Sequence, residues 1–199
     1  MQGRSSTMAA NIILVTQPHF VEGEARILNE LFANGLELLH LRKPQAKEGE
    51  LRGLIAQIDG QYRQRIVAHS HFHLVGELGL RGAHLGSNRR LDVEPFKGQL
   101  SFSCHSLAEV QRHKCDCEYV FLSPIFDSIS KQGYTAAFSV QTILTARAEG
   151  VIDRKVIALG GVTPERVREA FVMGFGGVAV LGDIWLSDDP VRRFLEYEN

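Results

Sequence analysis

The chain has 199 residues and a mass of 22.1 kDa, which fits one domain large enough to bury a substantial core. Hydrophobic residues make up 44% and charged residues 23%, a balance typical of a soluble globular protein. The net charge of −1 argues against a nucleic-acid partner. No run approaches the roughly 18 apolar residues of a membrane span. We therefore expect neither a nucleic-acid nor a membrane partner.

The amino-terminal segment and the cysteines indicate the cellular compartment of the protein. Residues 1–10 lack the apolar run of a secretory signal, so we expect a flexible tail ahead of one domain at 11–199. Cys104, Cys115 and Cys117 are odd in number and lack a disulfide-framework spacing, which suits a reducing cytoplasm. Cys115 and Cys117 look like half of a zinc site, but no second ligand pair accompanies them, so no structural metal is expected there.

Short β-rich runs alternate with amphipathic stretches along the chain, a pattern typical of parallel βα units. The first strand is expected at 12–16, followed by a helix at 22–34 that Asn34 and Gly35 end, because both residue types tolerate the left-handed conformation. The second strand, 36–42, is apolar nearly throughout, as in a strand covered on both faces. Further strands are expected at 65–68, 82–85, 100–104, 118–122, 155–159 and 177–181.

Helix start signals support this division of the chain. Ser106 and Glu109 form a capping box, in which a hydroxyl and a carboxylate bond free backbone N–H groups. Thr163 and Asp189 each precede a proline at a first helical position. The segment 86–99 is too irregular to predict a helix and is expected to be a loop with at most one turn.

Eight strands without a linker predict a single (β/α)8 TIM barrel, with a doubly wound open sheet as the alternative. The fifth strand favours the barrel. Ser101, Ser103 and His105 alternate with Phe102 and Cys104, so one face is polar and the other apolar. In a barrel the apolar face meets the helices and the polar face points into the interior.

Barrel enzymes act at the carboxyl ends of their strands. Histidines stand at four consecutive strand ends, those of strands two to five: His40, His69, His84 and His105. Imidazole takes up and returns protons near neutral pH, so these residues are candidates for acid–base catalysis. The competing interpretation, a histidine that only forms hydrogen bonds in the core, is strongest for His84.

Glycines follow the last two strands and predict a phosphate site. Gly160 and Gly161 close the seventh strand, and Gly182 follows Leu181 at the end of the eighth. Loops at these positions commonly bind phosphate, because glycine lets backbone N–H groups approach the anion closely. The long segment 123–137 contains Lys131, which could cap a phosphate, and it is long enough to close as a lid.

Six motifs in register resemble the thiamin phosphate synthase superfamily. They are L-H-L-R at 39–42, G-A-H-L-G at 82–86, S-C-H-S at 103–106, S-P-I-F-D-S-I-S-K at 123–131, I-A-L-G-G-V at 157–162, and the final phosphate strand at 177–184. The resemblance spans 12–185. It implies a TIM barrel that acts in thiamin biosynthesis.

The chain departs from this superfamily where the synthase holds magnesium. The synthase joins a pyrimidine pyrophosphate to a thiazole phosphate, with metal held by an Asp in an N-D pair after strand three and an acidic residue after strand four. Here those segments read Ala68-His69 and Ser87-Asn88-Arg89-Arg90. The lysine that follows the strand-two arginine by two places is replaced by Pro44. The resemblance therefore favours the sister branch of thiazole tautomerases.

The leading hypothesis is a tautomerase-like isomerase of a phosphorylated thiazole that needs no metal. The resemblance implies that His105 is the acid/base and His40 a second proton donor or an orienting group. Arg42 would grip the substrate carboxylate with two parallel hydrogen bonds. The expected phosphate ligands are Ser130, Lys131, Gly160, Gly161, Leu181 and Gly182.

Three alternatives stay open. One is a magnesium-dependent thiamin phosphate synthase with Asp92 or Asp127 as a displaced ligand. Another is a non-catalytic protein that only binds a phosphorylated ligand. The least favoured is a transition metal on His40, His69, His84 and His105, because adjacent strand ends rarely converge into metal geometry. A homodimer through the first two helices is also compatible with the pattern.

Overall fold

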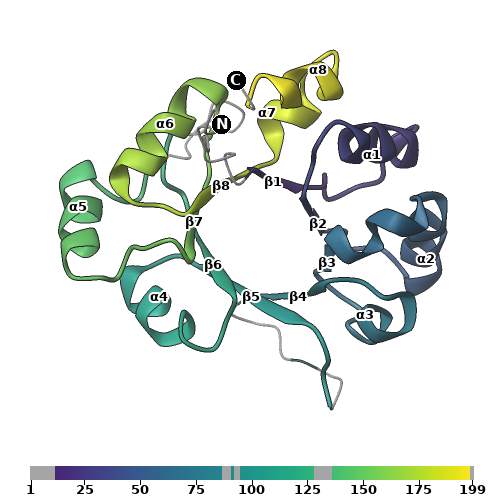
Figure 1. Cartoon of the computed structure of the whole chain (residues 1–199), viewed down its shortest axis with the longest axis horizontal. Coiled ribbons are helices and arrows are strands. Elements are labelled where there is room, and N and C mark those ends of the chain that lie inside the picture. The colour runs from purple at the N-terminus through teal and green to yellow at the C-terminus, as the bar shows by residue number, and fades with distance from the viewer. Residues whose placement is uncertain (1–11, 87–90, 92–94, 128–135, 198–199) are drawn as a thin grey trace, which may run out of the picture.

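The structure is a computed structural model that describes residues 12–86, 91, 95–127 and 136–197. Within these residues, eight strands close into one barrel in chain order, and β8 pairs with β1. Every pair is parallel, and the helices surround the ring of strands (Figure 1). The predicted (β/α)8 barrel is confirmed, and the open doubly wound sheet is excluded.

The element bounds follow the predicted pattern closely. The strands are β1 Ile12–Val15, β2 Leu38–Leu41, β3 Ile66–Ala68, β4 Gly82–Leu85, β5 Gln99–Cys104, β6 Tyr119–Leu122, β7 Val156–Leu159 and β8 Gly177–Val180. The helices are α1 Glu24–Ala33, α2 Glu48–Gln57, α3 His73–Leu78, α4 Leu107–His113, α5 Val140–Ala148, α6 Pro164–Met173, α7 Gly182–Trp185 and α8 Pro190–Leu195, with a 3-10 turn η1 at Gly60–Arg65.

The start of β2 differs from its prediction by two residues. The N–H of Leu36 bonds to the carbonyl of Leu31 at 3.0 Å, and Gly35 has φ 106°. Residues 34–36 therefore complete the carboxyl end of α1, because a left-handed glycine lets these N–H groups satisfy the last helical carbonyls.

Helices begin at all three predicted positions, although the Thr163 side chain forms no capping hydrogen bond at the start of α6. The Ser106 hydroxyl accepts from the N–H of Glu109 at 3.2 Å, and the Glu109 carboxylate accepts from the N–H of His105 at 2.6 Å. Asp189 caps α8 by accepting from the N–H of Arg192 at 3.0 Å. The described residues of 86–99 that precede β5 form no helix, as expected.

Two apolar layers hold the barrel together. The larger core lies between strands and helices and includes Phe102 and Cys104, the outward residues of β5. The smaller one fills the interior with side chains from β1, β6, β7 and β8: Ile13, Val15, Tyr119, Phe121, Ile157 and Ala179. The remaining interior, facing β2 to β5, carries polar side chains, and this half of the barrel positions the candidate site.

The remaining predictions concern the amino-terminal tail, membrane spans and the cysteines. The expected tail at 1–10 lies outside the described residues. In the described part of the chain, no helix is long and apolar enough to cross a membrane. The three cysteines are free thiols, as predicted from their spacing.

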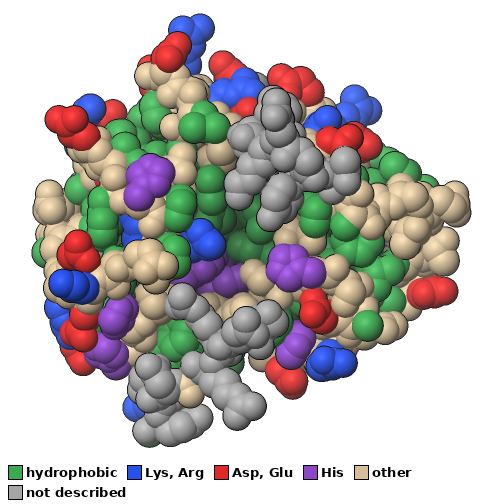
Figure 2. Space-filling view, turned by 180° about the vertical axis from the view of Figure 1, so that it is seen from behind, with side chains coloured by type: hydrophobic (Ala, Val, Ile, Leu, Met, Phe, Trp, Pro, Cys, Tyr) green, Lys and Arg blue, Asp and Glu red, His purple; other side chains and the backbone are tan. Residues whose placement is uncertain are grey.

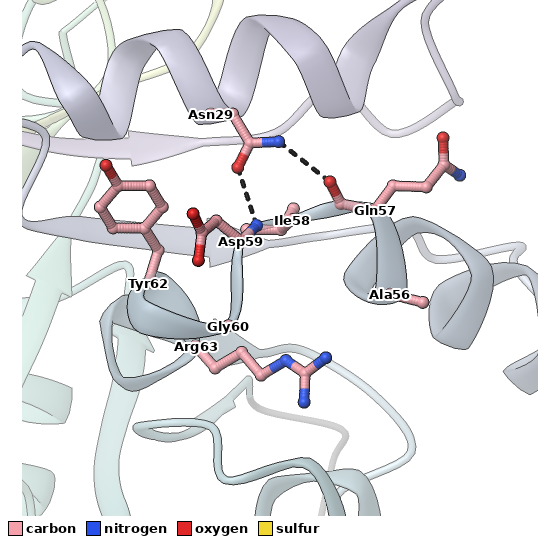
Figure 3. Close-up of a pocket in the computed structure, with 8 residues that line it drawn as sticks. All are labelled: Asn29, Ala56, Gln57, Ile58, Asp59, Gly60, Tyr62 and Arg63. Atoms are coloured by element: carbon pink, nitrogen blue, oxygen red, sulfur yellow. Dashed lines mark hydrogen bonds between the residues drawn. The ribbon is translucent and has the colours of Figure 1, made fainter.

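A pocket beside α1 lies away from the carboxyl ends of the strands. It is lined by the end of α2 and by η1, which leads directly into the start of β3 (Figure 3). The Asn29 amide spans it, donating to the carbonyl of Gln57 and accepting from the N–H of Asp59, both at 2.9 Å. We assign this pocket a structural role, because barrel enzymes act at the opposite ends of their strands.

Candidate active site

Three histidines from neighbouring strands meet inside the mouth, the end of the barrel where the strands' carboxyl ends lie. His40 belongs to β2 and His84 to β4, and both are buried, with exposed fractions of 0% and 3%. His69 follows β3 directly and is partly exposed. Figure 2 shows a central hollow with histidine side chains at its base and Lys or Arg side chains beside them. We call His40, His69 and His84 the histidine cluster.

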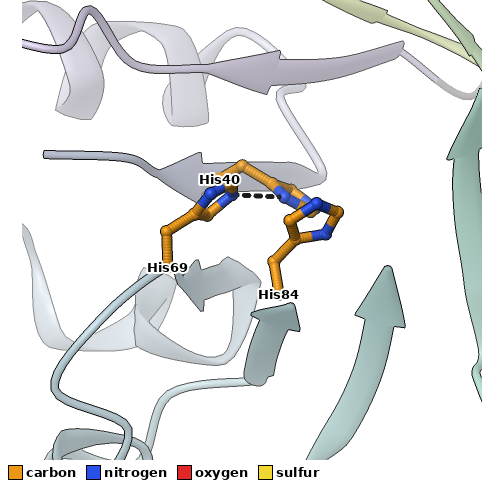
Figure 4. A group of neighbouring side chains, drawn as sticks. All are labelled: His40, His69 and His84. Carbon is orange, nitrogen blue, oxygen red and sulfur yellow. Dashed lines mark hydrogen bonds between the residues drawn. The ribbon is translucent and has the colours of Figure 1, made fainter. Parts of the chain in front are cut away.

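The cluster is compact. His40 Nδ1 lies 2.9 Å from His69 Nε2, and one ring nitrogen from each of the three residues lies within 4.8 Å of the others (Figure 4). The His69 and His84 rings stack with centroids 4.4 Å apart. The expectation that adjacent strand ends do not converge is therefore wrong for these three residues. The twist and tilt of barrel strands bring inward side chains of β2, β3 and β4 together.

Hydroxyl groups from β5 and β6 bind the buried side of the cluster. Tyr119 Oη lies 2.6 Å from His40 Nε2, while Ser101 Oγ and Ser103 Oγ lie 2.8 and 2.7 Å from the two ring nitrogens of His84. The contacts of His84 therefore agree with the competing interpretation, in which this histidine forms hydrogen bonds in the core. These bonds fix the ring orientations of His40 and His84.

The environment keeps the two buried imidazoles neutral. Burial, followed by the neighbouring His84, lowers the pKa of His40 well below its ordinary value. Burial, followed by the positive charge of Arg42, lowers the pKa of His84 to about 3. Burial likewise raises the pKa of the Tyr119 phenol, so it remains protonated. Near neutral pH these groups can exchange protons along hydrogen bonds but carry no charge.

His105 lies apart from the cluster, on the rim after β5. It is exposed, and its Nδ1 is 3.2 Å from the carbonyl oxygen and 3.3 Å from the hydroxyl of Ser123. The four-histidine group of the least favoured alternative is therefore corrected to three. His105 begins the loop before α4, where Glu109 holds its N–H, so its side chain turns toward β6 instead of the interior.

The turn after β7, which we call the glycine turn, has a backbone conformation that requires glycine. Gly160 and Gly161 both have positive φ, 95° and 65°. A Cβ on Gly161 would lie 2.4 Å from the Asp127 carbonyl oxygen, so only glycine fits there. Arg166 of α6 donates to the carbonyls of Asp127 and Gly161 at 3.0 and 2.8 Å and so joins this turn to the loop after β6.

The other predicted ligands have different placements. Leu181 links β8 to α7, and Gly182 is the first residue of α7, beside the glycine turn of the neighbouring strand. Arg42 is exposed at the end of β2, and its charge acts on His84. Ser130 and Lys131 lie outside the described residues, as does most of the segment 123–137, whose length would permit it to close as a lid.

Comparison with known proteins identifies the family. The sequence profile described as thiamine monophosphate synthase matches residues 12–184. The chain belongs to the thiamine monophosphate synthase family. The resemblance predicted from the six motifs is thereby confirmed.

Two relatives and two solved structures show the extent of the similarity. The thiamine-phosphate synthase of Psychrobacter sp. (strain PRwf-1) is 25% identical over 93% of this chain and 92% of its own. That of Yersinia pestis (strain Pestoides F) is 26% identical over 83% and 80%. The thiamine phosphate pyrophosphorylase structure from Bacteroides thetaiotaomicron is 35% identical over 94% of both chains, with a TM-score of 0.84. The one from Pyrococcus furiosus, 16% identical with a TM-score of 0.76, shows the fold alone.

The described residues of this family member do not fit magnesium, which prefers hard oxygen ligands such as carboxylates. β3 ends at Ala68, and His69 follows it. Four carboxylates near the loops of the mouth already have partners: Glu24 with Lys43, Glu109 with the His105 N–H, Asp127 with the Ala136 N–H, and Asp183 with Arg193. Asp92, a suggested substitute ligand, lies outside the described residues.

Several site residues of this family member escaped the sequence analysis. Tyr119 stands in the continuous apolar run of β6, so alternation could not show that it faces inward. Lys43 is only 1% exposed and pairs with Glu24 at 2.7 Å, which joins the loop after β2 to the start of α1. A lysine beside the predicted Arg42 was visible in the sequence, but its buried partner, 19 positions away, was not.

Proposed function

We propose that this member of the thiamine monophosphate synthase family is an isomerase that moves a proton on a phosphorylated carboxythiazole. The observation that carries the proposal is the chemistry of the mouth, where imidazoles from the ends of β2, β3 and β4 meet hydroxyls from β5 and β6 and the nearby described carboxylates are paired. Such groups suit proton transfer and offer little to magnesium.

His105 is the proposed acid/base. When Nδ1–H donates to the Ser123 carbonyl, the lone pair lies on Nε2, where it can accept a substrate proton. The imidazolium then returns a proton to a different atom of the thiazole. One proton leaves and one arrives, so the composition and redox state of the substrate are unchanged.

The remaining groups hold the substrate. The backbone at Gly160, Gly161 and Gly182 would bind the phosphate, since the glycine turn is built without space for side chains. Arg42 would pair with the substrate carboxylate. His40 is fully buried and bonded through both ring nitrogens, so we assign it the orienting role and not that of a direct proton donor.

A second candidate is the synthase reaction itself. It is favoured by the names of the relatives, which are thiamine-phosphate synthases or a thiamine phosphate pyrophosphorylase. That reaction joins a pyrimidine pyrophosphate to a thiazole phosphate and would require oxygen ligands for magnesium, whereas the described carboxylates near the mouth already have partners.

The test is a direct assay of both reactions with purified protein, once with magnesium and once with a chelator. We expect isomerisation of the carboxythiazole phosphate in chelator, reduced by about 10²–10⁴-fold in His105→Ala, the usual contribution of a positioned acid/base. His19→Ala is the matched control, because His19 is exposed on the loop after β1 and the side chain is placed in no proposed step.

Each outcome decides between the candidates. Magnesium-dependent condensation without isomerisation would replace the isomerase by the synthase. Full isomerisation by His105→Ala would remove His105 from the mechanism. Binding of thiazole phosphate without either reaction would establish the non-catalytic alternative.

A further inference from the structure

We propose that the histidine cluster is a binding site for a divalent transition-metal ion of the zinc class. This goes beyond the proposed isomerase, whose proton transfer at His105 uses no metal. The site consists of one nitrogen each from His40, His69 and His84.

The donor set defines the class of ion. Three imidazole nitrogens suit zinc, copper or nickel, whereas magnesium and calcium require oxygen ligands. Zinc commonly takes three protein ligands and leaves a fourth position open for water or substrate. His69 is the partly exposed member of the cluster, so the fourth position would face the hollow of the mouth.

The distances are close to those that an ion needs. Two ligands of one tetrahedral zinc stand about 3.3 Å apart, given Zn–N bonds of about 2.0–2.1 Å. His40 Nδ1 and His69 Nε2 are 2.9 Å apart, and the whole set lies within 4.8 Å. Small ring rotations would lengthen the distance between His40 Nδ1 and His69 Nε2 and shorten the longer nitrogen–nitrogen distances within the cluster. The ion would then replace the proton that His40 and His69 share.

The outer hydrogen bonds already occupy one ring nitrogen of His40 and one of His84, as in metal sites. A ligating histidine typically donates its other N–H to a neighbouring acceptor, which fixes the tautomer. Tyr119 Oη lies 2.6 Å from His40 Nε2, which leaves Nδ1 for the ion. Ser101 Oγ lies 2.8 Å from His84 Nδ1, which leaves Nε2, now bonded to Ser103 Oγ. Coordination by His84 would release Ser103.

The charge around the site favours an anion as the fourth ligand. The positive charge of Arg42 acts on His84 and opposes a bare cation. A hydroxide, a carboxylate or a phosphate oxygen on the ion would lie within the same positive field and offset it. The site should therefore hold its ion more tightly when an anionic ligand is present.

The experiment uses the full chain without a polyhistidine tag, stripped of metal by a chelator that is then removed. Zinc is titrated by calorimetry, and cobalt is added separately, because tetrahedral cobalt with nitrogen ligands absorbs visible light strongly. We expect one zinc per chain and an intense cobalt spectrum. Absence of zinc binding by the unmodified chain at micromolar concentrations would overturn the proposal.

Variants locate the ion. His69→Ala should lose the zinc stoichiometry and the cobalt spectrum. Tyr119→Phe, which removes the partner of His40, should weaken zinc binding by about 10–100-fold. His73→Ala is the matched control, because His73 lies on α3 and pairs with Glu48 at 3.2 Å outside the cluster. It should bind zinc like the unmodified chain.

Circular dichroism first establishes that each variant is folded. Unchanged binding by a folded His69→Ala would overturn the proposal. If His69→Ala does not fold, Tyr119→Phe decides, and unchanged affinity there would overturn it equally. Isomerisation in chelator combined with no metal binding would refute this inference alone, whereas metal binding without isomerisation would refute only the proposed function.

Discussion

At the scale of single residues, the histidine cluster shows that burial determines what an imidazole can do. A histidine in water titrates near neutral pH, whereas His40 and His84 stay neutral because burial penalises the charged ring. Their nitrogens are nevertheless bonded, since an unpaired polar atom inside a barrel costs free energy of its own.

This burial makes folding stability depend on pH. An unfolded histidine has a pKa near 6.5, while that of His84 in the folded chain is about 3. Between these values the unfolded chain binds more protons, so the stability contributed above pH 6.5 is lost as the pH falls. In metal-free buffer we expect His84 alone to lower the free energy of unfolding by about 2 kcal/mol at pH 5 relative to pH 7.

The comparison that isolates this effect is urea unfolding of the unmodified chain and of His84→Gln at both pH values. The glutamine keeps polar atoms near Ser101 and Ser103 but does not titrate. The variant should therefore lose less stability between pH 7 and pH 5. Equal losses in the two proteins would contradict a buried, neutral His84.

At the scale of elements, the connection from β7 to α6 depends on backbone conformation more than on side chains. Gly161 has φ 65° and closely approaches the carbonyls of Phe126 and Asp127 from the loop after β6. Arg166 bonds both segments. The glycine turn and the base of the loop after β6 therefore form one structural unit, and a substitution in either segment should alter the conformation of the other.

Gly161→Ala tests this unit. Alanine loses about 1–2 kcal/mol in the left-handed conformation, and its Cβ would clash with the Asp127 carbonyl oxygen at 2.4 Å. We expect a loss of about 2–3 kcal/mol in the free energy of unfolding, together with weaker phosphate binding, measured by chemical unfolding and by phosphate titration.

The matched control is Gly53→Ala. Gly53 lies on α2, and a Cβ at this position would meet no other atom within 4 Å, so alanine should stabilise the helix by about 0.5–1 kcal/mol. A Gly161→Ala protein as stable as the unmodified chain would show that the turn tolerates a side chain and that its glycines are ordinary turn residues.

At the scale of the whole molecule, closure of the barrel brings the two ends of the described chain together. Trp185 of α7 donates from Nε1 to the carbonyl of Val15 at 2.9 Å, across 170 positions of sequence. β1 and β8 pair beneath this contact. The carboxyl-terminal helices therefore stabilise the first strand and its register with β8, which shapes the mouth.

Trp185→Phe should weaken this closure. The change removes one buried hydrogen bond and part of a packed ring, which together cost about 1–3 kcal/mol in the free energy of unfolding. The measurement is urea unfolding followed by circular dichroism, because Trp185 is the only tryptophan. The neighbouring Leu186, 67% exposed, supplies the control, and Leu186→Ala should stay within about 0.5 kcal/mol. Equal stability of both variants would contradict a role in closure.

Local sequence determined much of this protein. Side-chain period and backbone preference act over a few residues. They explain the alternation in β5, the cap at Ser106, the end of α1 at Gly35 and the chain order of the strands. The same local rules placed histidines and glycines at strand ends, and six motifs in register indicated the family.

Tertiary structure alone decided how these residues combine. The sequence shows four histidines at strand ends, but the twist and tilt of the closed barrel bring three together and leave His105 on the rim. Tyr119 and His40 lie 79 positions apart, and Lys43 of the loop after β2 pairs with Glu24 at the start of α1. Such pairs form because each buried polar atom needs a partner, and which partner is within reach depends on the packing of the entire chain.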